Sequence, residues 1–530
     1  MNFTGLTLPT NDTPARALLL FLAASAGAYL LYRALYLTFW SPLARIPGPT
    51  LFCIVPETWH PTYLRGTYHE TLAEWHRRYG PVVRTGPRTV SVTDYHLYRK
   101  LHSDPSIIRD VSFVGILQVD RPHLSSMSSS NPLHGLHRRL LNPAFSAPSV
   151  AEMEPLIYEA FVKYWDSAYT AQVAAQGTTH QSVKLNLLKM SHRITLGVIL
   201  SVVMGISPAR ADFNLLFDDL TGTYESVIKT LVLRLLTGRF AYMYEALGLS
   251  EGKRAYYRAT SFIHREFTKR VTHCLVSSLG DASAAPSDRI DVVGKLATTL
   301  VGAALDDQTT LDEMVRELVP ELFFMLAAGY DTAGNTLGFM FWQLFVHPGI
   351  HARAREEVRS NYPDPNVSLS LHMIQTTLPY VEALVYETMR CFPSLPSRLP
   401  RILTGPGKAV GDYFIPSGTS IHTPIYSLHR NPDNWEEPDR FMPERFLGAK
   451  GELLKKQVYA FNMGAHHCIG RRVALSEMML VAANVLLKYD LEPVGSDDPR
   501  RAIITQANMR FDTPDLWARV TLQPDVNLIS

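Results

Sequence analysis

The sequence predicts a mainly α-helical protein with small β-sheets, preceded by one transmembrane helix. Three observations support this: apolar residues recur mostly at helical spacing, short alternating segments occur in only a few places, and an uncharged apolar run lies near the N-terminus. The 530 residues are 46% apolar and 10% aromatic, which is enough to bury a large core. Because no segment has the composition of an interdomain linker, we expect one large domain after the anchor.

Helical spacing of apolar residues predicts the long helices, and alternation predicts the strands. The predicted helices cover about residues 150–170, 185–205, 213–236, 310–346, 376–390 and 471–488. Val82–Arg84 and Thr89–Val92 are expected to form a short hairpin, and Ala409–Thr423 further short strands. The segment 277–289 is rich in Ser, Ala, Asp and Pro and is the clearest loop candidate.

The N-terminal apolar run predicts a membrane anchor over residues 17–40. Residues 17–32 carry no charge, and the run continues after Arg33 to Trp40. A helix over 17–32 alone spans about 24 Å, less than the hydrocarbon thickness of about 30 Å, so the anchor must continue to Trp40 while Arg33 snorkels. A cleavable signal peptide is the alternative, which the long apolar run and the weakly basic start of the chain disfavour.

Charge asymmetry around the anchor predicts its orientation. Basic residues follow the run at Arg45 and Arg65, so residues 1–16 are expected in the lumen of the endoplasmic reticulum and the body in the cytosol. Asn2 and Asn11 begin sequons that would be glycosylated in the lumen, whereas the sequon at Asn366 would face the cytosol and stay unused.

A proline-rich segment follows the anchor. Residues 41–50 contain Pro42, Pro47 and Pro49, which remove backbone donors and prevent the anchor helix from continuing. We therefore expect a stiff hinge over residues 41–50, followed by one large domain over residues 51–530.

The overall composition argues against two classes of partner or site. The net charge of +2 gives no basic excess for nucleic-acid binding. Cys53, Cys274, Cys391 and Cys468 are widely separated, which argues against a disulfide framework and a structural zinc site. The body is therefore expected in a reducing compartment.

The segment FNMGAHHCIG, residues 461–470, is the strongest functional signal. It precedes an apolar helix, and the N–H groups and dipole at a helix N-terminus favour a Cys468 thiolate that can bind iron. Gly464 and Gly470 allow the turn to pass close beneath a flat cofactor, and Phe461 can shield the sulfur.

Two other interpretations of this segment stay open on the residues alone. Cys468 can be a buried, inert cysteine, which is the usual role of a single cysteine. His466, His467 and Cys468 can form a zinc site, although three consecutive residues converge on one metal only with difficulty.

A second signal interrupts the centre of the long apolar helix at Ala328-Gly-Tyr-Asp331-Thr332. Buried Asp and Thr side chains are costly unless they are paired or functional. Ala328 and Gly329 are small enough for a flat ligand to approach the backbone, and the Thr332 hydroxyl can open the helix by taking the i−4 carbonyl. A transmembrane span is the alternative, which polar residues at its middle disfavour.

Charged residues in apolar surroundings give a third signal. Glu387 and Arg390 lie three positions apart, on one face of an otherwise apolar helix. Arg445 follows in the segment Phe-Met-Pro-Glu-Arg-Phe, residues 441–446, before the cysteine segment. Most pairs at this spacing are solvated and contribute little, so the apolar surroundings are what distinguish this one.

Taken with His134-Gly-Leu-His-Arg138, these segments resemble the motifs of the cytochrome P450 family and follow the family's order. The resemblance implies the cytochrome P450 fold and heme b, with Cys468 as the axial iron ligand and Ala328 beside the cofactor. It also implies that Asp331 and Thr332 deliver protons during oxygen activation. Glu387, Arg390 and Arg445 would form the structural network behind the heme.

Two positions depart from the family pattern. His466 replaces the usual arginine two residues before the cysteine, and His134 replaces the tryptophan four residues before Arg138. By resemblance, Arg138 and Arg398 would contact the heme propionates, because the planar guanidinium binds carboxylates in bidentate fashion.

The resemblance implies a monooxygenase that inserts one oxygen atom from O2 into an organic substrate. Electrons would come from NADPH through NADPH-cytochrome P450 reductase, with cytochrome b5 as a further partner. The family's substrate-contact regions carry apolar residues here, among them Phe113, Leu117 and Phe324, so we expect a lipophilic substrate, in specialised metabolite biosynthesis. A heme-thiolate isomerase or dehydratase and a non-catalytic heme sensor are the alternatives, and Asp331 and Thr332 argue against both.

Overall fold

The computed structural model describes residues 13–526 apart from 55–59, 111–132, 177–181, 209–212, 238–246, 248, 281–289, 297–307, 398, 496–502, 506–508 and 512–514. Five residues singled out in the sequence therefore lie outside the described residues: Asn2, Asn11, Phe113, Leu117 and Arg398.

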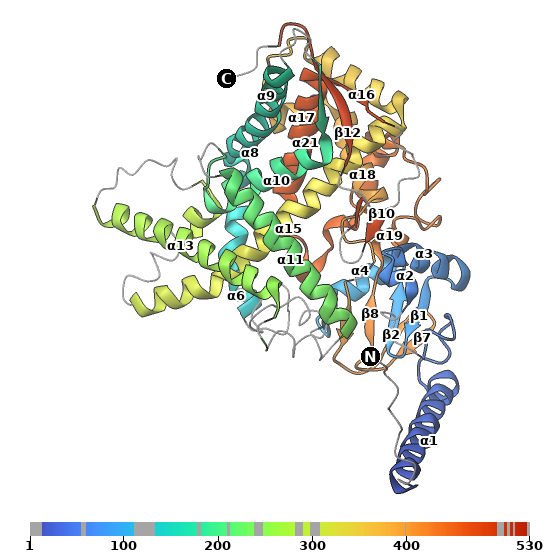
Figure 1. Ribbon diagram of the computed structural model, residues 1–530. Coiled ribbons are helices and arrows are strands. Elements are labelled where there is room, and N and C mark those ends of the chain that lie inside the picture. Colours follow the sequence, from blue (N-terminus) through green and yellow to red (C-terminus); the bar gives the residue numbers. More distant parts are fainter. Residues whose placement is uncertain are drawn as a thin grey trace, which may run out of the picture.

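Helices dominate the described chain, and α15 runs through its middle (Figure 1). The α-helices are α1 Thr13–Leu35, α2 Pro61–Leu64, α3 Tyr68–Tyr79, α4 Tyr95–Ser103, α6 Leu133–Leu141, α7 Ala147–Glu152, α8 Glu154–Phe161, α9 Ser167–Gln176, α10 Leu187–Met204, α11 Phe213–Thr237, α13 Glu251–Gly280, α15 Gln308–Val346, α16 Pro348–Asn361, α17 Leu371–Thr377, α18 Pro379–Cys391, α19 Ile425–Leu428, α20 Gly448–Lys455 and α21 Arg471–Lys488. Shorter turns are η1 Tyr36–Trp40, η4 Asn142–Phe145, η5 Val162–Asp166, η7 Pro443–Phe446, η8 Tyr459–Phe461 and η9 Gly464–His466.

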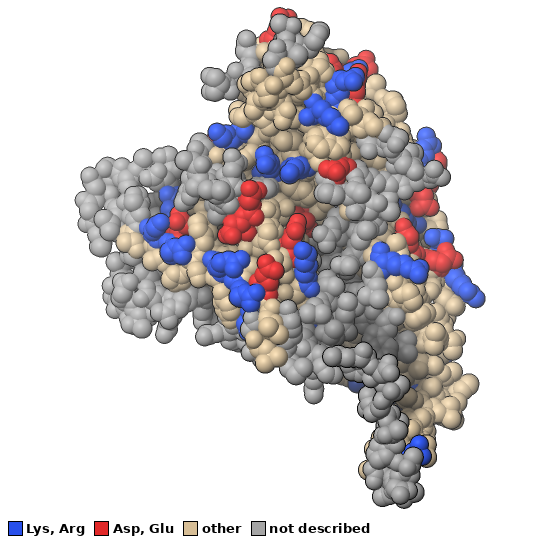
Figure 2. Space-filling view, in the orientation of Figure 1, with Lys and Arg blue, Asp and Glu red and all other residues tan. Residues whose placement is uncertain are grey.

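The strands of the described residues form four small sheets. The strands are β1 Val82–Gly86, β2 Thr89–Val92, β3 Ile107–Arg109, β4 Ser182–Asn186, β5 Arg401–Leu403, β6 Lys408–Val410, β7 Tyr413–Ile415, β8 Ser420–His422, β9 Tyr489–Pro493, β10 Ile503–Thr505, β11 Met509–Phe511 and β12 Trp517–Leu522. The largest sheet has the order β1-β2-β8-β5-β3, and the others are β4-β12-β9, β6-β7 and β10-β11. On the face drawn in Figure 2, basic and acidic side chains are interspersed.

The predicted fold class is confirmed, since helices predominate and the sheets are small. The predicted hairpin is present as β1 and β2, and the strands expected near Ala409–Thr423 are β6, β7 and β8. The helix expected near 150–170 is interrupted between α7 and α8, because Pro155 starts a new helix, and from Glu154 it continues through the π-helical segment η5 into α9. Several helices were not predicted, among them α3, α4, α13, α16 and α20.

The core depends on close packing between α10 and α15. A Cβ atom added at Gly329 or Gly338 would lie 2.6 Å from a methyl carbon of Ile199 or Leu188 of α10, so a larger residue there would force that side chain to move. Gly329 therefore lies at the contact between α10 and α15, and the expectation that Ala328 and Gly329 let a flat ligand approach the backbone stays a prediction.

Among the residues that the structure describes, two helices are long and apolar enough to cross a membrane. Residues Leu187–Met204 form α10, which is largely buried in the core. Within Arg16–Trp40, the most apolar window of 18 residues is not buried, and α1 projects away from the body in Figure 1. The N-terminal helix is therefore the candidate transmembrane span.

Candidate functional site

The Cys468 loop lies between the short turn η9 and the start of α21. The Cys468 N–H donates to the Phe461 carbonyl over 2.9 Å, and the His467 N–H donates to the Gly464 carbonyl over 3.1 Å. Cys468 is exposed to solvent, although the protein atoms around its sulfur keep much of the bulk water away from it. Burial raises the pKa of its thiol, whereas the Gly470 N–H and the guanidinium groups of Arg138 and Arg471 lower it.

Backbone geometry explains one glycine of this loop but not the other. Gly464 has φ 75°, a left-handed conformation that disfavours other residues, and it lies against the His102 carbonyl. Gly470 has φ −80°, which any residue adopts, and nothing lies within 4 Å of an added Cβ. The conformational freedom of glycine is therefore not needed at position 470. What Gly470 contributes is its N–H, which bonds to the Cys468 sulfur and lowers the pKa of the thiol.

The structure brings Glu387, Arg390 and Arg445 together in a buried network. The Arg390 guanidinium donates to both carboxylate oxygens of Glu387, over 2.7 and 2.8 Å, and Arg445 Nε donates to Glu387 Oε1 over 3.2 Å. The Met442 N–H also donates to Glu387 Oε1, over 2.7 Å. Glu387 and Arg390 are fully buried, so the pair is stable only because its charges and hydrogen-bonding groups are matched.

His429 connects this network to the Cys468 loop. Its Nε2 accepts the Tyr459 N–H over 3.0 Å, so its Nδ1 carries the proton and donates to the Arg390 carbonyl over 3.1 Å. Burial first, and the charge of Arg390 next, lower the pKa of His429 to about 3. The Arg390 guanidinium in turn donates to the His429 carbonyl. The neutral imidazole therefore fixes the distance between α18 and the turn that leads to Cys468.

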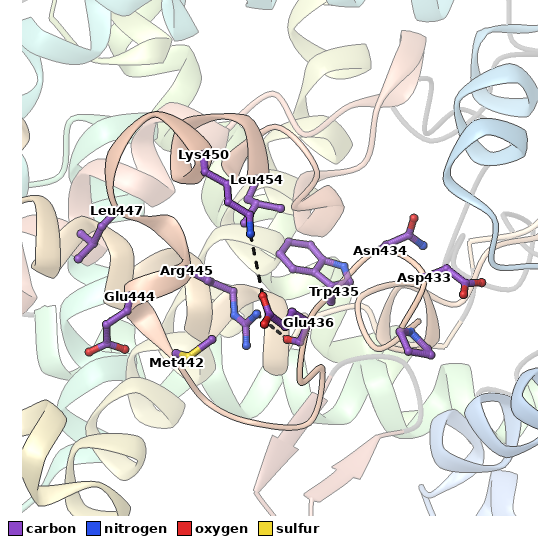
Figure 3. Close-up of a pocket in the computed structure, with 11 residues that line it drawn as sticks. Asp433, Asn434, Trp435, Glu436, Met442, Glu444, Arg445, Leu447, Lys450 and Leu454 are labelled. Carbon is purple, nitrogen blue, oxygen red and sulfur yellow. Dashed lines mark hydrogen bonds and ion pairs between the residues drawn. The ribbon is translucent and has the colours of Figure 1, made fainter.

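A cleft of about 630 Å³ lies on the outer side of the network (Figure 3). Trp435, Glu436, Arg445 and Lys450 are among its lining residues. Arg445 is common to the cleft and the network, because its Nη1 donates to the Glu436 carbonyl over 2.8 Å. None of residues 461–470 lines this cleft, so it is separate from the Cys468 site.

A cluster of basic groups lies beside the loop. Arg109 of β3 and Arg401 of β5 are direct partners in an antiparallel pair. Like charges placed opposite each other are destabilising, and burial followed by the charge of Arg401 lowers the pKa of Arg109 to about 9. Burial lowers the pKa of Arg401 to about 10. This arrangement suits an anionic group that binds both side chains.

The two residues that depart from the family pattern lie in contact. The rings of His134 and His466 are 4.4 Å apart. Burial and then the charges of Arg109, His134, Arg401 and Arg138 lower the pKa of His466 to about 2, so it is neutral. Neither ring nitrogen of His466 has a hydrogen-bond partner among the described residues.

Arg138 extends this cluster toward the cysteine. Its Nη2 donates to the His467 carbonyl over 3.1 Å, and burial lowers the pKa of its guanidinium. Sequence reasoning missed Arg109 and Arg401, and it selected Arg398, which lies outside the described residues. The strand pairing that joins Arg109 to Arg401 was the missing signal, because these two residues are far apart in the sequence.

The centre of α15 carries the second set of predicted residues. The Thr332 hydroxyl donates to the Ala328 carbonyl over 2.6 Å, at the i−4 position expected for a hydroxyl that perturbs a helix. The buried Asp331 carboxylate accepts from Asn335 Nδ2 over 3.1 Å. The Ser394 hydroxyl lies 3.3 Å from the Thr332 carbonyl, so a second segment borders this part of the helix.

Comparison with known proteins decides the family. A model of the family described as cytochrome P450 matches residues 46–514. The chain belongs to the cytochrome P450 family. It is 27% identical over 508 residues to cytochrome P450 monooxygenase TRI4 of Trichoderma arundinaceum, and this alignment covers 89% of each chain. It is 26% identical over 480 residues to cytochrome P450 monooxygenase helB1 of Aspergillus fumigatus, and this alignment covers 89% of this chain and 78% of the relative.

As a P450 monooxygenase, the protein is an oxidoreductase, and the family implies a heme with a thiolate-bound iron. The residues of this site fit such a group. An accessible cysteine precedes α21, and the neighbouring Arg109, Arg138 and Arg401 supply positive charge for carboxylates. Neither buried ring nitrogen of His466 has a partner in the part of the chain that the structure describes.

Proposed function

We propose that this P450 inserts one oxygen atom from O2 into a lipophilic small molecule, with electrons from NADPH through NADPH-cytochrome P450 reductase. Cytochrome b5 is a further proposed electron donor. The observation that carries the proposal is the accessible Cys468 beside the basic cluster, in a chain whose central helix carries the Thr332 hydroxyl on the Ala328 carbonyl. A role in specialised metabolite biosynthesis rests on the similarity to fungal monooxygenases alone.

Each proposed site residue has a distinct task. Cys468 would bind the iron through its thiolate, and Arg109, Arg138 and Arg401 would hold the carboxylates of the cofactor, with His466 as a neutral hydrogen-bond donor. When bound, the heme would supply the iron centre that activates O2. Glu387, Arg390 and Arg445 keep the segment before Cys468 in place.

Thr332 and Asp331 are proposed to deliver protons. The Thr332 hydroxyl can exchange the Ala328 carbonyl for another acceptor by one rotation about its χ1 angle, which presents its proton outside the helix. Asp331 is proposed to replace that proton. Asn335 keeps the Asp331 carboxylate oriented.

Two alternative activities of the same site differ in their use of oxygen. A heme-thiolate isomerase or dehydratase needs no O2, and a heme sensor has no turnover. The test is NADPH-dependent O2 consumption by the purified enzyme and its reductase during a metabolite screen. Product that carries one atom of labelled oxygen supports a monooxygenase, and product formed without O2 would indicate the isomerase or dehydratase.

We also propose the topology expected from the sequence. Residues 17–40 would anchor the protein in the membrane of the endoplasmic reticulum, residues 1–16 would lie in the lumen, and residues 41–50 would lead to the cytosolic domain 51–530. Resistance to carbonate extraction tests the anchor. A glycosidase-sensitive mass shift that disappears in Asn2→Gln/Asn11→Gln tests the lumenal side.

A further inference from the structure

The junction between the candidate membrane span and the body is built around the buried side chain of Arg84. Arg84 lies in β1 and is 2% exposed. Its Nη1 donates to the Leu37 carbonyl over 2.7 Å, its Nη2 to the Pro87 carbonyl over 3.1 Å and its Nε to the Gly86 carbonyl over 3.2 Å. One guanidinium therefore binds the end of the apolar helix and the β1–β2 turn together.

The Leu37 carbonyl is a favourable acceptor for this cation. Leu37 lies in η1, which continues α1 and ends at Trp40. The last carbonyl groups of a helix lack partners within the helix, and the C-terminal end of the helix dipole attracts positive charge. Ser41 N–H satisfies the Tyr36 carbonyl, and Arg84 satisfies that of Leu37.

The three carbonyl groups account for the placement of Arg84. Within the part of the chain that the structure describes, no acidic side chain pairs with it. Burial lowers the pKa of Arg84, while the neighbouring Cys53 raises it. A buried charge needs compensation, and here the compensation comes from backbone groups that belong to two different parts of the chain.

The proline-rich segment is fixed to the same sheet. The Arg84 N–H donates to the Pro47 carbonyl over 2.8 Å, and Cys53 Sγ lies 3.5 Å from the Arg84 carbonyl. Leu43 and Ile46 are buried in one apolar cluster, which also contains side chains of β1, β2, β7 and β8. The segment from Leu37 to Ile46 thus packs as part of the body.

We propose that Arg84 locks the end of the membrane segment to the largest sheet, so that the catalytic body is held at a fixed angle to the bilayer. Near the end of the proposed anchor over residues 17–40, Leu37 then contacts protein instead of lipid, because its side chain is buried. In Figure 1, α1 leaves the body on the side of β1, β2 and β7.

The exposed side chains around the junction suit a bilayer surface. Phe39 and Trp40 are about two-thirds exposed, and so are Leu51 and Phe414 of β7. Aromatic side chains favour the membrane–water interface. By holding Leu37 against the sheet, the Arg84 side chain (below, the Arg84 lock) places these exposed side chains where the body meets the lipid headgroups.

The lock can be tested in the full-length, cofactor-loaded protein in lipid nanodiscs. Trypsin cuts after the exposed Arg45 only when the hinge detaches, and mass spectrometry follows that one cleavage. Arg84→Met should raise its rate at least tenfold. Arg88→Met, which removes an exposed arginine from the same hairpin, should leave the rate unchanged. Equal rates in wild type and Arg84→Met would overturn the proposal.

A second measurement needs no variant. Polarised absorption of the heme in oriented bilayers should give one narrow tilt angle for the wild-type protein. A broad distribution of angles would overturn the proposal even if Arg84→Met failed to fold. The cleavage measurement does not depend on turnover, so a failure of the lock is distinguishable from a failure of the proposed activity.

Discussion

The Cys468 loop and the centre of α15 are built in opposite ways. Side chains from other elements hold the loop: the Tyr98 hydroxyl donates to Asn462 Oδ1 over 2.8 Å, and His429 accepts the Tyr459 N–H. In α15, the hydroxyl groups of Thr332 and Thr336 donate to carbonyls four residues earlier in the same helix. The loop is therefore suited to fix a metal ligand, whereas the helix centre keeps hydroxyl groups that can change partners.

The largest expected effect lies in the network that holds the loop. Glu387→Ala removes the only carboxylate among the three residues and leaves Arg390 buried and unpaired. Breaking a buried pair costs about 3–5 kcal/mol, so we expect little folded heme protein. Denaturant unfolding and heme content measure the effect.

The exposed pair of Glu74 and Arg77 supplies the control for this change. Glu74→Ala should cost at most about 1 kcal/mol. Similar losses in both variants would show that the network does not hold the loop.

Thr332→Ala tests the centre of α15, where the hydroxyl group is proposed to deliver protons. We expect heme and substrate binding to stay unchanged, because the hydroxyl bonds only within its helix and lies half-buried. Product formation should fall by about 10² or more, the usual share of a positioned proton donor, and peroxide should appear instead. The ratio of product to NADPH consumed measures this, and Thr332→Ser should retain most coupling. Full coupling in Thr332→Ala would remove the proton-delivery role.

The rate of heme loss should depend on whether the substituted residue is charged or neutral. Arg401→Ala and Arg138→Ala should speed heme transfer to an excess apo-acceptor by about 10–100-fold, as expected for loss of a charged hydrogen bond of about 1.5–3 kcal/mol. His466→Ala should change the rate less than about tenfold, because His466 is neutral. The exposed neighbour Arg139 gives the control variant Arg139→Ala. Faster loss from His466→Ala than from Arg138→Ala would contradict this order.

The smallest effect at neutral pH concerns His429. Its pKa is about 3 in the folded protein and near 6.5 when unfolded, so protonation favours the unfolded chain. Its stabilising contribution is complete above pH 6.5 and is lost as the pH falls toward 3. His429→Gln, which can both donate and accept, should reduce the acid sensitivity of the unfolding free energy measured between pH 7.5 and 4.5. An unchanged slope would mean that His429 is not neutral in the fold.

The sequence predicted the apolar parts of the fold better than its charged surface. The cores of α10, α15 and α21 have strong helical spacing of apolar residues. The helix α16 has only a narrow apolar stripe of Ile350, Ala354 and Val358, because most of its other residues are charged or polar. Its prediction would have required knowledge of the surface against which it packs.

At the site, the sequence predicted residues that lie close to one another in the chain. Glu387 and Arg390 are neighbours on one helix, and Cys468 lies within ten residues of its loop partners. Arg109 and Arg401 meet only through the pairing of β3 with β5, and His429 connects Arg390 to Tyr459 across three segments. Such long-range contacts leave no local pattern in the sequence.

The most direct test of the central claim is the absorption spectrum of the reduced protein with carbon monoxide. If the Cys468 thiolate binds the heme iron, the wild-type complex shows the red-shifted Soret band of thiolate ligation, and Cys468→Ala loses that band. Cys53→Ala, which changes another cysteine, should keep it. A red-shifted band that persists in Cys468→Ala would contradict the account.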